Sequence, residues 1–124
     1  MTLINSLWNN KKFFSFIFYT ALIVCCYLFF SQPAFNIDVA HSDKYGHIMV
    51  FFTLAMLLNR FSALRIKLQI LLLTGFGISV EIVQSFIPYR SGSVDDVVAD
   101  ILGLLLFYGL LKLIEHFSAT NKHD

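Results

Sequence analysis

Four long apolar stretches alternate with short polar segments along the chain. They cover about residues 13–30, 43–59, 68–87 and 96–114. A helix needs about 20 mostly apolar residues to cross the hydrocarbon core of a bilayer, so each stretch has roughly the length of a membrane span. The pattern predicts an all-α integral membrane bundle of four transmembrane helices, built as one domain over residues 1–124.

Residues at the edges of these stretches suit helix ends. Ser42 fits the N-cap of the second stretch, whose polar first turn hydropathy alone would leave out. Pro88 stops the third stretch, because proline cannot continue a helix and disfavours helical geometry in Ile87. Ser93 and Asp96 suit a helix N-terminus, where oxygen atoms accept hydrogen bonds from free N–H groups and negative charge meets the positive end of the helix dipole.

The composition agrees with a membrane protein, and the placement of the basic residues argues against a nucleic-acid-binding one. Hydrophobic residues make up 57% of the chain and charged residues 14%, and the net charge of +1 by itself says nothing about nucleic acid. Lysine and arginine fall between the apolar stretches instead of clustering on one face, as nucleic-acid recognition requires. No nucleic-acid partner is therefore expected.

The basic residues also predict how the chain lies in the membrane. Positively charged residues near the ends of spans favour the cytoplasmic side. Both termini are therefore expected in the cytoplasm, in a multi-pass protein of the inner (cytoplasmic) membrane, with residues 31–42 and 88–94 outside. The residues assigned to the cytoplasmic side are Lys11, Lys12, Arg60, Arg65, Lys67, Lys112 and Lys122, and only Lys44 and Arg90 fall on the outer side.

Three ionisable side chains, His47, Glu81 and Asp100, lie inside the apolar stretches. A charged side chain in hydrocarbon costs about 2.5 to 3.5 kcal/mol even on lenient scales, so something must offset that cost. Each has a polar neighbour about one helical turn away on the same helix face. Gly77 and Gly103 lie on these faces and permit close helix packing, so the sequence predicts one outward-facing polar pocket. The neighbouring pairs are Asp43 with His47, Glu81 with Gln84, and Asp96 with Asp100.

Three polar motifs occur in order along the chain: Asp43-Lys44-x-x-His47, then Glu81-x-x-Gln84 with Pro88-x-Arg90, then Ser93-x-x-Asp96-x-x-x-Asp100-x-x-Gly103. They resemble the motifs of the VanZ-like membrane proteins, over Asp43 to about Gly109. The resemblance implies a small integral membrane protein of the cell envelope, in a family named for a protein associated with teicoplanin resistance, and it supplies no reaction. Asp100 stands where the family commonly has Asn, and Phe51 where Tyr is common.

The acids of the pocket outnumber its bases, since Arg90 and Lys44 are the only cations on that side. The acids cannot all be ionised, close together and dry, so either one carboxyl group holds a proton or a cationic group binds. The opposite interpretation is a satisfied network of ion pairs and hydrogen bonds that only fixes helix packing. The acids in question are Asp43, Glu81, Asp95, Asp96 and Asp100.

The residues suggest individual roles. His47 is a candidate general base, with Asp43 fixing its tautomer, and Arg90 with Lys44 suits a lipid phosphate or an anionic precursor. A metal site of His47, Glu81 and Asp96 or Asp100 is a weaker alternative, because no second histidine or cysteine ligand supports it, and no metal or cofactor is expected. The candidate catalytic residues are His47, Glu81 and Asp100, and the candidate binding residues are Asp43, Lys44, Gln84, Arg90 and Asp96.

The function expected from these features is binding of an envelope lipid or lipid-linked precursor head group, linked to glycopeptide resistance by the family resemblance. Whether binding is followed by acid/base chemistry on a phosphate-containing or acyl group is left open by the sequence. Two alternatives from other classes also stay open: a small proton- or cation-coupled transporter and a non-catalytic membrane partner subunit.

Overall fold

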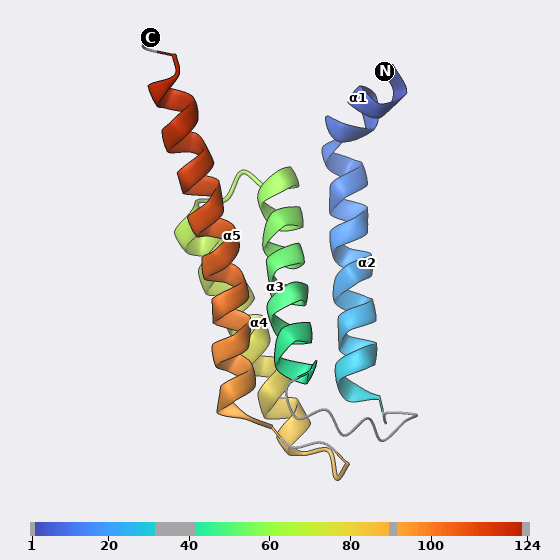
Figure 1. The fold of residues 1–124 in the computed structure, drawn as a ribbon. Coiled ribbons are helices and arrows are strands. Elements are labelled where there is room, and N and C mark those ends of the chain that lie inside the picture. Colours follow the sequence, from blue (N-terminus) through green and yellow to red (C-terminus); the bar gives the residue numbers. More distant parts are fainter. Residues whose placement is uncertain (1, 32–41, 90–91, 123–124) are drawn as a thin grey trace.

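Five helices make up most of the part of the chain that the structure describes (Figure 1). In this computed structural model, residues 2–31, 42–89 and 92–122 are described, with the side chains of residues 2, 42 and 43 excepted. The prediction of an all-α chain is confirmed. The helices are α1 (Thr2–Trp8), α2 (Lys11–Phe30), α3 (Ser42–Phe61), α4 (Ile66–Ser85) and α5 (Val94–Thr120).

The four long helices run alternately up and down, so both chain termini lie at one end of the bundle (Figure 1). We call this the terminal end; α1 and the turn between α3 and α4 also lie there. The opposite, distal end holds the last turn of α4 and the first turn of α5. Helix α3 is central, because it packs most extensively against α5 and also contacts α2 and α4.

Three of the described helices, not the expected four, are long and apolar enough to be candidate membrane spans. They are α2, α4 and α5. Helix α3 has the length of a span but carries Asp43, Lys44 and His47 in its first turns and Asn59 and Arg60 near its end. These residues reduce its apolar character, so the prediction of a fourth span is not supported by composition.

The helix ends agree with the capping chemistry and differ from the predictions by a few residues. The side chain of Asn10 begins α2 by accepting from the backbone N–H of Lys12 and Phe13. Ser93 begins α5, as predicted, by accepting from the N–H of Asp95 at 3.2 Å. Helix α4 ends at Ser85, before Pro88, and α5 continues six residues beyond the predicted end. Helix α1 was not predicted, because seven residues are too few to register as an apolar span.

The core lies where α3 meets α5 and α4. Phe51, Leu54 and Leu104 are almost completely removed from solvent. Gly103 makes this packing possible, since any Cβ atom there would collide with the backbone carbonyl of Ile48 on α3. The predicted role of Gly103 in close helix approach is confirmed, and it sets the distance between the two helices that carry the histidine and the aspartates.

Candidate functional site

A buried histidine and a buried aspartate form the centre of the polar site near the distal end. His47 on α3 is 6% exposed and Asp100 on α5 is 1% exposed. The Nδ1 atom of His47 lies 2.7 Å from Oδ1 of Asp100. The imidazole also stacks on Phe29 of α2, with the ring centroids 4.8 Å apart and the planes 14° apart. Two other helices therefore fix the orientation of this ring.

The second nitrogen of His47 faces another carboxylate. Nε2 lies 3.9 Å from Oδ2 of Asp96, whose side chain is 18% exposed. Asp96 and Asp100 are one helical turn apart, so α5 presents both to the same ring, as their spacing predicted. If Nδ1 carries the ring proton and donates a hydrogen bond to Asp100, Nε2 keeps its lone pair and faces Asp96.

Glu81 on α4 is the third acid and lies close to the same place. It is 7% exposed, and its Oε2 accepts a hydrogen bond from the backbone N–H of Ser93 at 2.8 Å. Its Oε1 is buried and has no hydrogen-bond partner among the described residues. The hydrogen bond to Oε2 thus links α4 to the start of α5, and Oε1 lacks a described hydrogen-bond donor.

Gly77 makes room for Asp100. A Cβ atom at Gly77 would lie 2.6 Å from Oδ2 of Asp100, well inside van der Waals contact. That Oδ2 atom is itself buried without a hydrogen-bond partner in the described part of the chain. Two buried carboxylate oxygens, one on Glu81 and one on Asp100, therefore remain unsatisfied, which is uncommon in folded proteins.

We call His47, Glu81, Asp96 and Asp100 the acid cluster. One nitrogen or oxygen atom from each of His47, Glu81 and Asp96 lies within 4.8 Å of the other two. Among the described residues, no lysine or arginine pairs with these four. The cluster therefore has an excess of acceptor oxygens and suits a proton, a cation or a hydrogen-bond donor.

The remaining predicted residues lie around the cluster. Gln84 is buried, but its Nε2 donates to the backbone carbonyl of Phe29 at 2.8 Å, so its amide nitrogen holds α2 against α4. Tyr89 similarly donates its hydroxyl hydrogen to the carbonyl of Phe30 at 2.9 Å. These contacts satisfy two carbonyls at the C-terminal end of α2, where no intrahelical donor is available.

Lys44, one of the three remaining predicted residues, lies at the exposed rim of the acid cluster. The Nζ atom of Lys44 pairs with Oδ2 of Asp95 at 3.3 Å, in an exposed position. Arg90 and the side chain of Asp43 lie outside the described residues. Sequence reasoning missed Phe29 and the N–H of Ser93, because neither a packing ring nor a backbone donor stands out in an apolar sequence.

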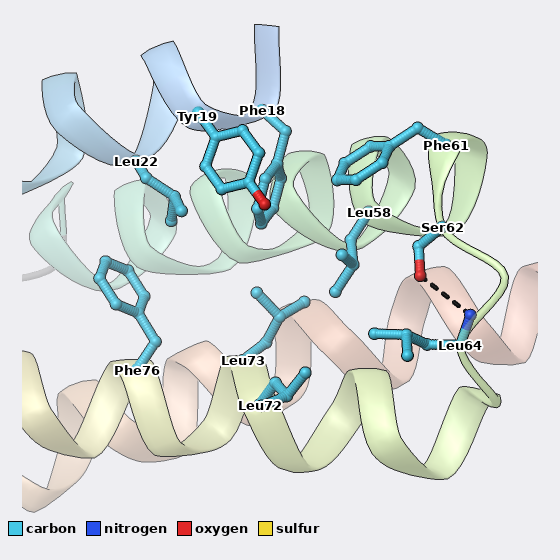
Figure 2. Close-up of a pocket in the computed structure, with 10 residues that line it drawn as sticks. All are labelled: Phe18, Tyr19, Leu22, Leu58, Phe61, Ser62, Leu64, Leu72, Leu73 and Phe76. Atoms are coloured by element: carbon cyan, nitrogen blue, oxygen red, sulfur yellow. Dashed lines mark hydrogen bonds between the residues drawn. The ribbon is translucent and has the colours of Figure 1, made fainter. Parts of the chain in front are cut away.

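A separate, apolar cavity of about 280 Å³ lies between α2, α3 and α4. Figure 2 shows its walls, which include Phe18, Leu22, Leu73 and Phe76, and the turn after α3, where Ser62 Oγ accepts from the N–H of Leu64 at 2.9 Å. None of its lining residues is charged. The cavity suits an apolar chain, because most of its lining side chains are apolar and its side-chain polar groups are the hydroxyls of Tyr19 and Ser62.

One family model matches most of the chain. The model of the VanZ/LLP1 family matches residues 4–115. An uncharacterized protein of Schizosaccharomyces pombe is 35% identical over 112 residues, which are 86% of this chain and 66% of that protein. No solved structure matches. The family match includes all the motifs on which the resemblance to VanZ-like proteins rests.

Proposed function

We propose that this chain, which belongs to the VanZ/LLP1 family, binds the polar head group of an envelope lipid or lipid-linked precursor at the acid cluster. The family and the apolar helices make it a multi-pass membrane protein. The observation that carries the proposal is the pair of buried, unsatisfied carboxylate oxygens on Glu81 and Asp100. Such groups are costly unless a ligand or a proton compensates them.

For the orientation, we propose that the distal end faces outward and that both termini lie in the cytoplasm of an inner-membrane protein. The basic residues Arg60, Arg65 and Lys67 near the terminal end support this, by the positive-inside rule. Helix α3 then crosses as a fourth element, because α2, α4 and α5 all contact it and its His47 is buried. Both termini at one end fit an even number of crossings.

The chemistry of the cluster defines which part of a head group it binds. Its carboxylates accept hydrogen bonds from amine or hydroxyl groups, which occur in phospholipid and sugar head groups. A phosphate would be held at the rim, by Lys44 and by Arg90, whose guanidinium suits bidentate bonds. Asp43 and Gln84 complete the proposed binding set.

His47 gives the site a candidate general base. Asp100 holds the ring through Nδ1, and Phe29 packs on its face, so Nε2 is presented in a fixed direction. This is the arrangement in which an aspartate sets the tautomer and orientation of a catalytic histidine. In a reaction on a phosphate-containing or acyl group, His47 or Glu81 would transfer the proton, with Asp100 as the partner of His47.

The alternative of a proton- or cation-coupled transporter has less support. Directly beneath the acid cluster, Phe51, Leu54 and Leu104 form an apolar layer between the cluster and the buried Gln69 nearer the terminal end. A transport path through one chain needs polar groups or water at that depth. No observation favours the third alternative, a non-catalytic partner subunit.

Native mass spectrometry of the protein extracted with its own lipids tests the proposal. We expect a retained lipid on the wild-type protein, and its loss in Glu81→Gln and Arg90→Ala. Glu115→Gln is the matched control, because Glu115 is an exposed acid on α5 that is far from the cluster. Equal lipid retention in all variants, or none in the wild type, would refute the proposal. Where expression of the wild type confers teicoplanin resistance, Glu81→Gln is expected to abolish it.

A further inference from the structure

We infer that His47, Glu81 and Asp96 form a binding site for a divalent transition-metal ion, with Zn²⁺ as the first candidate. Their ligand atoms, one nitrogen and two carboxylate oxygens, lie within 4.8 Å of one another and come from three different helices. The inference goes beyond the head-group proposal and uses the same cluster, and its test measures metal binding without any lipid.

The orientation of His47 is the first argument. A histidine that binds a metal through one ring nitrogen usually donates the N–H of the other to a carboxylate, which fixes both tautomer and direction. The 2.7 Å contact between Nδ1 and Asp100 supplies that partner. Nε2 is left facing Asp96 at 3.9 Å, on the side where the metal would be held.

The unsatisfied oxygen of Glu81 is the second, independent argument. Glu81 is more than nine-tenths buried, and its Oε1 has no hydrogen-bond partner among the described residues. Its Oε2 is already held by the N–H of Ser93, so the carboxylate is fixed with one oxygen free. A metal ion would satisfy that oxygen and offset the negative charge, which a buried carboxylate requires.

Metal binding requires the three ligand atoms to move closer together. Zinc binds nitrogen and oxygen ligands at about 2.0 to 2.2 Å, which places neighbouring ligand atoms roughly 3.3 Å apart. Nε2 of His47 lies 3.9 Å from Oδ2 of Asp96, and all three ligand atoms lie within 4.8 Å of one another. Asp96 is the ligand most free to move, because its side chain is 18% exposed and has no other ion-pair partner in the described chain.

The donor set also indicates which ion binds. An imidazole nitrogen favours first-row transition ions over Ca²⁺ and Mg²⁺, which prefer all-oxygen sites. Two carboxylates balance the charge of a divalent ion. Three protein ligands leave a fourth coordination position open. An oxygen atom of a bound molecule could occupy it, because the metal ion would supply positive charge in a cluster that is otherwise acidic.

The test is a Zn²⁺ titration of the purified, chelator-treated full-length protein, followed by calorimetry and by metal analysis after desalting. We expect about one ion per chain. Glu81→Gln and Asp96→Asn should each weaken binding by more than about tenfold, and Ca²⁺ should not compete. Asp95→Asn is the matched control, because Asp95 neighbours Asp96 but is 72% exposed and pairs with Lys44. It should bind Zn²⁺ as the wild type does.

Asp100→Asn tests the positioning role. The variant should keep about one ion per chain but bind it roughly 10- to 100-fold more weakly, as expected for loss of a carboxylate behind a metal-bound histidine. Thermal unfolding of each variant establishes that it is folded, and Asp96→Asn carries the test if the buried Glu81 variant does not fold. The inference is wrong if the wild type binds no Zn²⁺, or if Glu81→Gln and Asp96→Asn bind it as tightly as the wild type does.

Discussion

Two groups of buried polar side chains lie in this apolar bundle, and they are satisfied to different degrees. Toward the terminal end, Gln69 on α4 is 1% exposed and uses both ends of its amide. Its Nε2 donates to Asn59 Oδ1 at 3.2 Å and to the carbonyl of Leu64 at 2.8 Å. Its Oε1 accepts from the hydroxyl of Tyr108 at 2.8 Å. This neutral network joins α3, α4 and α5.

The acid cluster near the distal end joins the same three helices with ionisable groups, and it is incomplete. Glu81 and Asp100 each keep one buried oxygen without a partner in the described chain. A closed neutral network stabilises helix packing, whereas an open set of acids costs free energy until a proton or ligand binds. The contrast is why we assign structure to the first group and ligand binding to the second.

Gln69→Ala should have the largest effect on stability. It removes a fully buried side chain and leaves the hydroxyl of Tyr108 and the amide of Asn59 short of partners. We expect a loss of about 2 to 4 kcal/mol in the free energy of unfolding. Unfolding in one detergent measures it, with the exposed Ser79→Ala as control. An unchanged midpoint would mean that the neutral network does not hold the helices.

Gly77→Ala should have the next largest effect. The added Cβ would lie 2.6 Å from Oδ2 of Asp100, so the variant must shift α4 or displace the aspartate from His47, at a cost of about 1 to 3 kcal/mol. Gly75→Ala, on the same helix with no atom within 4 Å of its added Cβ, should be neutral or slightly stabilising. Equal melting of the two variants would contradict the packing described here.

Glu81→Gln should change stability by less than about 1 kcal/mol and still abolish ligand binding. The glutamine can keep the hydrogen bond from Ser93, and it removes an uncompensated buried charge. Thermal unfolding and bound mass, measured on the same preparation, separate the two effects. A loss of stability as large as that of Gln69→Ala, with unchanged ligand content, would make the acid cluster a structural network.

Lys44→Ala should have the smallest effect on stability. Its pair with Asp95 is exposed, with side chains 43% and 72% accessible, so the free energy of unfolding should change by less than about 0.5 kcal/mol. Chemical denaturation checks this value. A large destabilisation would show that the rim contributes to the fold and not only to head-group binding.

The apolar pattern predicted the four long helices because burial in lipid requires continuous hydrophobic stretches. It did not predict that α3 is too polar to be a candidate span. Helix α3 contacts three other helices, and this packing lets it carry polar residues near its ends. Helical spacing placed Asp96 and Asp100 on one face of α5. The rotation of one helix against another decides contacts across helices, so the sequence suggested Asp43 as the partner of His47, and the structure places Asp100 on Nδ1.

The most direct measurement is the mass bound to the native protein, compared between the wild type and Glu81→Gln at equal abundance and equal thermal stability. If the acid cluster is a ligand site, the wild type carries a bound ion or lipid that Glu81→Gln has lost. If both proteins carry the same bound mass, or neither carries any, the acid cluster is not the site of ligand binding.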